Sequence, residues 1–179
     1  MTSEGALYGQ SLYDLAKEEQ ITDRLLEELE MVGSLFSENT DYITLLLEPS
    51  IPRKERLGLV DDAFRGQVHS YVLNLLKLML ENNLLREFNA CVRQYRASYN
   101  EDNGIAEAVV TSAVPLTDGE VEQLTAKLEQ FTGKKILLTQ KVDETVLGGL
   151  CVETDGKRLD GTVTGKLDDM RRMLSDIVL

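Results

Sequence analysis

The sequence contains a single histidine, two cysteines and no tryptophan among its 179 residues. A Ser-His-Asp or Cys-His catalyst would have to use His69, which begins a strongly apolar helical segment and has no nucleophile nearby in the sequence. We therefore interpret His69 as a cap or surface residue. A zinc site needs clusters of cysteine and histidine, and this sequence has none.

The two cysteines, Cys91 and Cys151, lie far apart in the sequence, each within an apolar helix or strand pattern. The chain has neither a CxxC pair nor the cysteine framework of a secreted disulfide protein. This usage predicts two buried free thiols in a reducing compartment.

Positive charge is also scarce, since 19 Lys and Arg residues face 31 Asp and Glu residues, which gives a net charge of -12. Nucleic-acid binders need clustered cations that displace counterions from phosphates. Anionic lipid surfaces likewise attract basic segments. The charge balance therefore argues against both nucleic acid and a lipid surface as direct partners.

Long apolar runs are absent. The most apolar stretch, Val68 to Leu80, is shorter than the ~20 residues that span a bilayer, and it carries His69, Asn74 and Lys77. The N-terminal sequence, MTSEGALYGQ, lacks the basic and apolar regions of a signal peptide. We expect no direct membrane insertion and a protein kept in a cytoplasm, most simply a bacterial one.

No motif for nucleotide or metal chemistry is complete. Gly161 to Leu167 superficially resembles a phosphate loop, but it has one residue too few between its glycines, and Leu167 stands where Ser or Thr must reach magnesium. The acidic stretch at 101–103 and the turn at 155–156 lack the alternating ligands of a calcium loop. We predict no catalytic residue, no cofactor, no metal site, and neither binding nor hydrolysis of ATP.

Helical periodicity dominates residues 1–104, where apolar residues recur at intervals of three and four. Turn signals divide this region into six helices joined by short connections, which is typical of a compact antiparallel bundle. The fold class that we predict for this part is a six-helix α-helical bundle.

The spacing of apolar residues changes after the polar break at 100–104, and the pattern over residues 105–179 predicts a small α+β domain. A strand over 105–114 precedes a helix that begins with a capping box at Thr117 and ends near Gly133. Two further strands are predicted at 134–141 and around 150–152, a short one follows the turn at Asp155-Gly156, and a last helix starts at Thr162.

The predicted helix over Val68–Leu80 carries more apolar surface than one core stripe needs. Its first stripe is Val68, Val72, Leu76 and Met79, and a second stripe of Tyr71, Leu75 and Leu78 lies beside it. Such a helix is either central in its bundle or presents the extra face to a partner, and composition leaves both readings open. Gly148-Gly149 is similarly open, because it fits a bend between strands or the close approach of a partner's backbone.

The order and spacing of several segments resemble one known family. They are YGQSLYDLA at 8–16, which is similar to the family's YAxALxxLA, then Ile51-Pro52, NLLKLMLEN at 74–82, VTSAVPLT at 110–117, VDETVLGG at 142–149 and DGT at 160–162. The chain departs from the family pattern at Gly9, where Ala is usual, and at Asn83, where Gly is favoured. The family is the delta subunit of bacterial F-type ATP synthase, the counterpart of the mitochondrial oligomycin-sensitivity-conferring protein.

The resemblance implies a non-catalytic stator subunit that joins the catalytic head to the peripheral stalk and resists rotor torque. It implies that residues 1–104 bind the N-terminal helices of alpha subunits in a groove between the first and fifth helices, and that residues 105–179 bind the b subunits. Such a protein would be peripheral, through its complex, on the cytoplasmic face of the bacterial cell membrane. By similarity, the groove residues are Tyr8, Ser11, Leu15, Tyr71, Leu75 and Leu78, and the stalk-facing residues are Gly148 and Gly149.

Two other functions remain as alternatives at this stage. The chain would also suit a helix-binding adaptor domain protein of another complex, which co-purification with ATP synthase subunits would distinguish. The second alternative is a small hydrolase that uses His69 or a carboxylate, although the sequence offers no nucleophile-base pair.

Overall fold

The computed structural model describes residues 3–143, 146, 149–154 and 157–160, the last four by their backbone alone. The chain divides into two compact units, Met1–Tyr99 and Asn100–Leu179. This division lies a few residues before the predicted boundary at 104. Each unit is described separately below.

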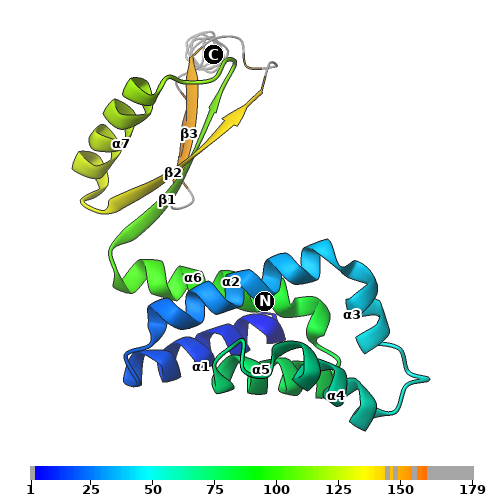
Figure 1. Ribbon diagram of the computed structural model, residues 1–179. Coiled ribbons are helices and arrows are strands. Elements are labelled where there is room, and N and C mark those ends of the chain that lie inside the picture. Colours follow the sequence, from blue (N-terminus) through cyan, green and yellow to red (C-terminus); the bar gives the residue numbers. More distant parts are fainter. Residues whose placement is uncertain (1–2, 144–145, 147–148, 155–156, 161–179) are drawn as a thin grey trace, which may run out of the picture. The chain divides into compact units, whose positions relative to one another are not determined.

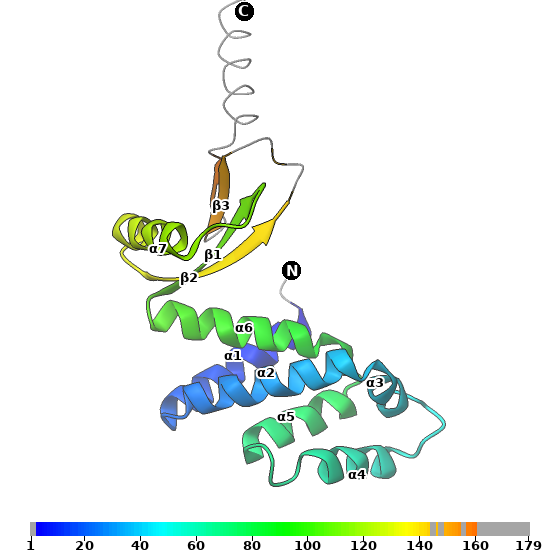
Figure 2. The same ribbon diagram turned by 45° about the horizontal axis from the view of Figure 1, so that its top comes forward.

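The N-terminal unit contains the six α-helices that the sequence predicts, plus one short 3₁₀ turn (Figure 1). In the second view, α6 and α2 run alongside each other over much of their length (Figure 2). The elements are α1 (Glu4–Glu18), α2 (Thr22–Glu38), α3 (Thr40–Leu46), α4 (Arg53–Phe64), α5 (Ser70–Glu81), η1 (Leu85–Glu87) and α6 (Phe88–Asp102), whose last turn extends past the division at Tyr99.

One apolar core holds these helices together, and every helix of the unit contributes buried side chains to it. Phe36 of α2 lies near its centre, with its ring edge-to-face against Phe64 of α4 and Phe88 of α6, at centroid distances of 6.0 and 5.2 Å. Such aromatic pairs add to the free energy gained by burying area alone. Phe36 of α2 therefore packs against α4 and α6 at one place in the core.

Two helix ends fix the direction of the chain at α1 and α5. After α5, Asn83 has a φ of 57°, and the N–H of Leu84 donates to the carbonyl of Met79 at 2.8 Å. After α1, Gln20 also has a φ of 57°, and the N–H of Ile21 donates to the carbonyl of Ala16 at 3.0 Å. Both ends are Schellman motifs, in which a left-handed residue satisfies the last carbonyls of the helix.

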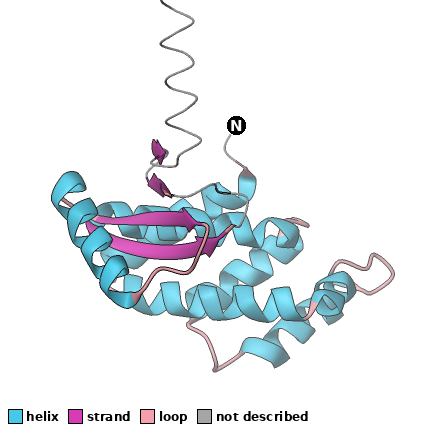
Figure 3. Cartoon of the chain, turned by 90° about the horizontal axis from the view of Figure 1, so that it is seen from above, coloured by secondary structure: helices cyan, strands magenta, loops and turns pink. Residues whose placement is uncertain are grey.

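The C-terminal unit is a four-stranded sheet with α7 against it, in agreement with the predicted α+β class (Figure 3). The strand order is β2-β1-β3-β4, in which β1 is parallel to β2 and antiparallel to β3, and β3 is antiparallel to β4. The elements are β1 (Ile105–Ser112), α7 (Asp118–Thr132), β2 (Lys135–Val142), β3 (Leu150–Thr154) and β4 (Lys157–Asp160).

Alternating burial along β1 creates the core of this unit. Ala106, Ala108 and Val110 are buried, and Leu128 of α7 packs against them. The predicted capping box forms at Thr117, whose N–H donates to the Glu120 carboxylate at 2.9 Å, and Gly133 ends α7 with a φ of 70°. The predicted turn at 155–156 and the helix from Thr162 lie outside the described residues.

Candidate functional site

The apolar residues of α5 differ in burial. Val72, Leu76 and Met79 have no exposed surface, whereas Leu78 is 44% exposed. Leu78 follows Leu76 by two residues, about 200° around an α-helix, so it points away from the core that Leu76 enters. The first stripe is therefore core, as predicted, and Leu78 faces outward.

Leu75 corrects the prediction that placed it in the groove. Its side chain is only 6% exposed and belongs to the core. The physical reason is that α5 packs against α1, α2, α4 and η1, so a wide arc of its surface is covered. Tyr71, in the first turn of α5, is partly buried and packs against the same core.

Helix α1 contributes an exposed apolar face beside the end of α5. Leu7 is 58% exposed, Leu15 is 38% exposed, and the exposed Ser11 lies between them at the four-residue spacing that shares one helix face. Leu7 escaped the sequence prediction, although its spacing from Ser11 and Leu15 was a usable signal.

A polar contact joins this face of α1 to α5. The side-chain amide of Asn82 donates to the hydroxyl of Tyr8 at 3.2 Å and to the carbonyl of Leu78 at 3.0 Å. Because Asn82 is one turn beyond Leu78, the outward side of α5 is continuous with Tyr8 of α1. Asn82, which sequence reasoning missed, thus links Tyr8 of α1 to the main chain of Leu78.

The junction of α1 with the end of α5 is hollowed into a surface pocket of about 480 Å³. Two of the predicted groove residues, Tyr8 and Ser11, line it. Its remaining walls come from residues that the sequence did not single out, because only the packing of α1 on the turn after α5 assembles them: Glu4, Leu7, Asn82 and Leu84.

Of the two predicted stalk-facing glycines, the structure describes only Gly149. Gly148 lies outside the described residues. Gly149 directly precedes β3 and has a φ of 88°, a backbone conformation that favours glycine. For Gly149, this conformation fits a bend before β3, the first of the two interpretations given above.

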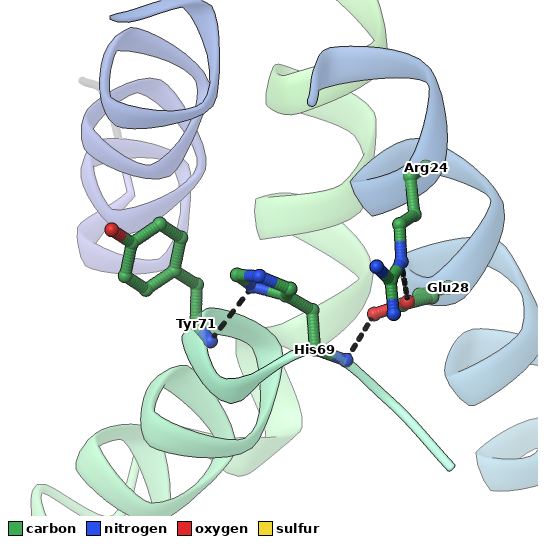
Figure 4. Close-up of polar contacts among 4 residues, drawn as sticks. All are labelled: Arg24, Glu28, His69 and Tyr71. Carbon is green, nitrogen blue, oxygen red and sulfur yellow. Dashed lines mark hydrogen bonds and ion pairs between the residues drawn. The ribbon is translucent and has the colours of Figure 1, made fainter. Parts of the chain in front are cut away.

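His69, predicted to be a cap or surface residue, is the N-cap of α5, and Figure 4 shows its surroundings. Its Nδ1 accepts a hydrogen bond from the main-chain N–H of Tyr71 at 3.3 Å. Its own main-chain N–H donates to Oε2 of Glu28 at 2.5 Å, and Oε1 of Glu28 pairs with Arg24 at 2.9 Å. These contacts give His69 a structural role in place of the catalytic role of the hydrolase alternative.

The buried thiols offer no nucleophile either. Burial raises the pKa of the Cys91 thiol to about 12, so it is protonated at neutral pH. Cys151 is buried as well. Within the described part of the chain, no three His, Cys, Asp or Glu residues gather as a metal site would require. In the same part, no helix combines the length and the apolar character that crossing a bilayer takes.

The chain is similar over nearly its whole length to bacterial ATP synthase subunits. A family model described as ATP synthase delta (OSCP) subunit matches residues 6–174. The ATP synthase subunit delta of Clostridioides difficile (strain 630) is 30% identical over 96% of this chain and 95% of its own length. The ATP synthase subunit delta of Lachnoclostridium phytofermentans is 32% identical over 96% of this chain and 95% of its own length.

The fold also matches a solved structure. A chain in the cryo-EM structure of the Toxoplasma gondii mitochondrial ATP synthase hexamer superposes with a TM-score of 0.78 over 96% of this chain and 97% of that one. At 15% identity this match shows a shared fold. Neither the relatives nor this structure supports an adaptor of another complex. The chain belongs to the ATP synthase delta (OSCP) subunit family, and it is a non-catalytic peripheral-stalk subunit of the F-type ATP synthase.

Proposed function

We propose that the N-terminal unit binds the N-terminal helices of alpha subunits of the catalytic head, in the groove between α1 and α5. The observation that carries the proposal is a pocket of about 480 Å³ that the exposed Leu7 lines, together with the exposed Leu15 further along α1 and the exposed Leu78 one turn before Asn82 on α5. Large exposed apolar side chains gathered around a hollow mark interaction sites on soluble proteins.

The chemistry of the groove suits an amphipathic helix. A groove between two helices accepts the apolar face of a third helix. The side chains at positions i, i+3, i+4 and i+7 of that third helix anchor it in the groove. Glu4, Ser11 and Asn82 supply a polar rim around the apolar residues. Rim groups of this kind set the orientation and the specificity of the bound helix more than its affinity.

We propose that the C-terminal unit binds the b subunits of the peripheral stalk, with the Gly148-Gly149 bend near the contact. The two partners together would make this chain the joint between head and stalk, held on the cytoplasmic face of the cell membrane through the complex. A joint that resists torque needs separate attachment surfaces for its two partners, and two compact units provide them.

Cysteine cross-linking in the assembled complex tests the groove. Both native cysteines of this chain are buried, so an engineered thiol is the main reactive one on it. Ser11→Cys lies on the exposed face of α1 and should form a cross-link to the N-terminal segment of an alpha subunit. Ser50→Cys, in the connection between α3 and α4, is the matched control and should form none. Equal cross-linking at both positions, or at neither, would refute the groove assignment.

A parallel experiment tests the stalk contact. The full chain should retain a peptide with the C-terminal sequence of the b subunit in a pull-down, and Leu78→Asp, which alters only the groove, should retain it equally well. Loss of the b peptide in this variant would mean that the two partners share one surface.

A further inference from the structure

The sheet of the C-terminal unit has two faces, and α7 covers one of them (Figure 1). Side chains alternate between the faces along a strand. Ala108 and Val110 of β1 lie in the core with Leu128 of α7, so they point to the covered face. The opposite face receives the residues between them. On β2 the residues of that face are all exposed, and they are Lys135, Leu137, Thr139 and Lys141.

The centre of this open face is apolar. Leu137 is 48% exposed, and Val109 of the neighbouring strand is 36% exposed. The register pairs Val109 with Thr139, the next outward residue after Leu137, so the two apolar side chains lie close together on adjacent strands. Toward β3 the face closes, because Cys151, which pairs with Thr111, is buried. The open area therefore lies over β1 and β2.

The pairing of these two strands favours a cover on both faces. All-parallel sheets occur almost only with both faces covered, whereas antiparallel sheets commonly leave one face in water. β1 and β2 are parallel, and in the described part of this unit α7 covers one face of the pair. The other face thus combines exposed apolar side chains with a strand pairing that is usually buried.

The charges on the open face are divided by strand. β2 contributes only cations, Lys135 and Lys141, and neither forms an ion pair within the described part of the chain. The carboxylates on this face, Glu107 and Glu153, come from β1 and β3, and Glu107 accepts a hydrogen bond from the side-chain amide of Asn100 at 3.0 Å. In a chain with a net charge of -12, β2 is thus a positively charged margin beside the apolar centre.

We propose that the open face over Leu137 and Val109 is the surface on which the C-terminal unit binds the peripheral stalk, an inference that rests on the proposed function and names its contact. The partner is an amphipathic α-helix whose apolar stripe lies on Leu137 and Val109. Its flank over β2 carries carboxylates that pair with Lys135 and Lys141. This helix and α7 enclose the sheet between two helical layers, which is a stable arrangement for a sheet with parallel strands.

The spacing of the lysines sets the length of the bound helix. Lys135 and Lys141 are six residues apart, which is about 20 Å along a strand that rises ~3.3 Å per residue. A helix that runs along β2 covers this length in about 13 residues, at ~1.5 Å per residue. The b-subunit helix should therefore carry two carboxylates roughly 13 residues apart on one flank of its apolar stripe.

The glycine bend lies at one end of the same face. Val142 of β2 and Leu150 of β3 both pair with Ser112 of β1. Lys141 directly precedes Val142, and Gly149 directly precedes Leu150. A helix that ends over Lys141 therefore ends near the bend, so one partner accounts for both positions.

The affinity of the full chain for a fluorescent peptide with the C-terminal sequence of the b subunit tests this surface. Leu137→Asp should weaken binding by about tenfold or more, as the loss of a central anchor does. Phe131→Asp makes a similar change at a 74% exposed residue of α7, so it is the matched control and should bind as the wild type does. Leu137→Thr keeps a residue that favours strands, and it replaces the Asp variant if that one fails to fold.

The dependence of binding on salt tests the charged margin. Replacing both lysines, Lys135→Gln with Lys141→Gln, should weaken binding at low ionic strength and remove most of its salt dependence, because exposed charge pairs are screened by salt. A double variant that binds and responds to salt as the wild type does would contradict the acidic flank of the partner.

The same measurements separate this surface from its alternatives. Binding that Leu137→Asp leaves unchanged overturns the surface and leaves the proposed stalk function standing, whereas a wild-type chain that does not bind the peptide contradicts both. A lower melting temperature of free Leu137→Thr would show that another segment of this chain covers the face, which also overturns the proposal. Self-association of the wild type that Leu137→Asp abolishes would assign the face to a second copy instead.

Discussion

The α-carbon of Gly9 lies directly against the main-chain carbonyl of Cys91, so that a Cβ at this position would stand 2.3 Å from the carbonyl oxygen. One turn earlier, a Cβ on Gly5 would lie 2.6 Å from the carbonyl oxygen of Glu87. These two contacts show that α1 approaches η1 and α6 at backbone distance. The position of the groove wall formed by α1 thus depends on residues without side chains.

Gly9→Ala should destabilise the N-terminal unit by about 1–3 kcal/mol, because the added methyl group must push α1 away from α6. Urea unfolding measures the change. Gly58→Ala in α4 is the matched control, since no atom lies within 4 Å of its Cβ, and it should stabilise the protein by about 0.5–1 kcal/mol. A Gly9→Ala variant as stable as the wild type would contradict the close packing.

Gln20→Gly should raise the stability of the protein by up to ~1 kcal/mol. Gln20 occupies the left-handed region, with a φ of 57°, where a residue with a Cβ is strained by about 1–2 kcal/mol and glycine is not. Part of this gain is lost to the greater freedom of glycine in the unfolded chain. Thermal unfolding compares this variant with Gln20→Ala, which keeps the strain and should show no gain.

Asp61→Asn should destabilise the protein more at neutral than at acid pH. The Asp61 carboxylate lies 2.6 Å from Nζ of Lys77 and 3.0 Å from Arg65, and hydrogen bonding to Lys77 is the main cause that lowers the pKa of Asp61 below its ordinary value. A lowered folded-state pKa stabilises the protein above the ordinary value, and this contribution disappears as pH falls through the lowered value. The difference between variant and wild type in urea midpoint should narrow between about pH 5 and pH 3.

Residues 1–104 should unfold cooperatively as an isolated fragment. The larger core draws all its residues from this part of the chain, and α6 ends at Asp102, inside the fragment. Circular dichroism during heating checks this, with the full chain as the reference. A fragment without a cooperative transition would show that the second unit is needed for the first to fold.

The sequence predicted what local periodicity determines. The six helices, the burial of Leu76 and the outward position of Leu78 follow from spacing along single helices. The core position of Leu75 does not, because it depends on how many neighbours surround α5. The contacts of Asn82 with Tyr8 and of Glu28 with His69 join residues 74 and 41 positions apart, which no local pattern encodes.

The groove is tested most directly by the affinity of the full chain for an alpha-subunit N-terminal peptide, compared between Leu78→Asp and Leu76→Asp. Leu78 is 44% exposed, so its replacement should change stability by no more than about 0.5 kcal/mol, while loss of a central anchor should cost ~2 kcal/mol or more in binding. Leu76 is fully buried, and a charge there should unfold the bundle. If Leu78→Asp melts the bundle as Leu76→Asp does, or leaves the affinity for the peptide unchanged, the groove between α1 and α5 is not the binding site.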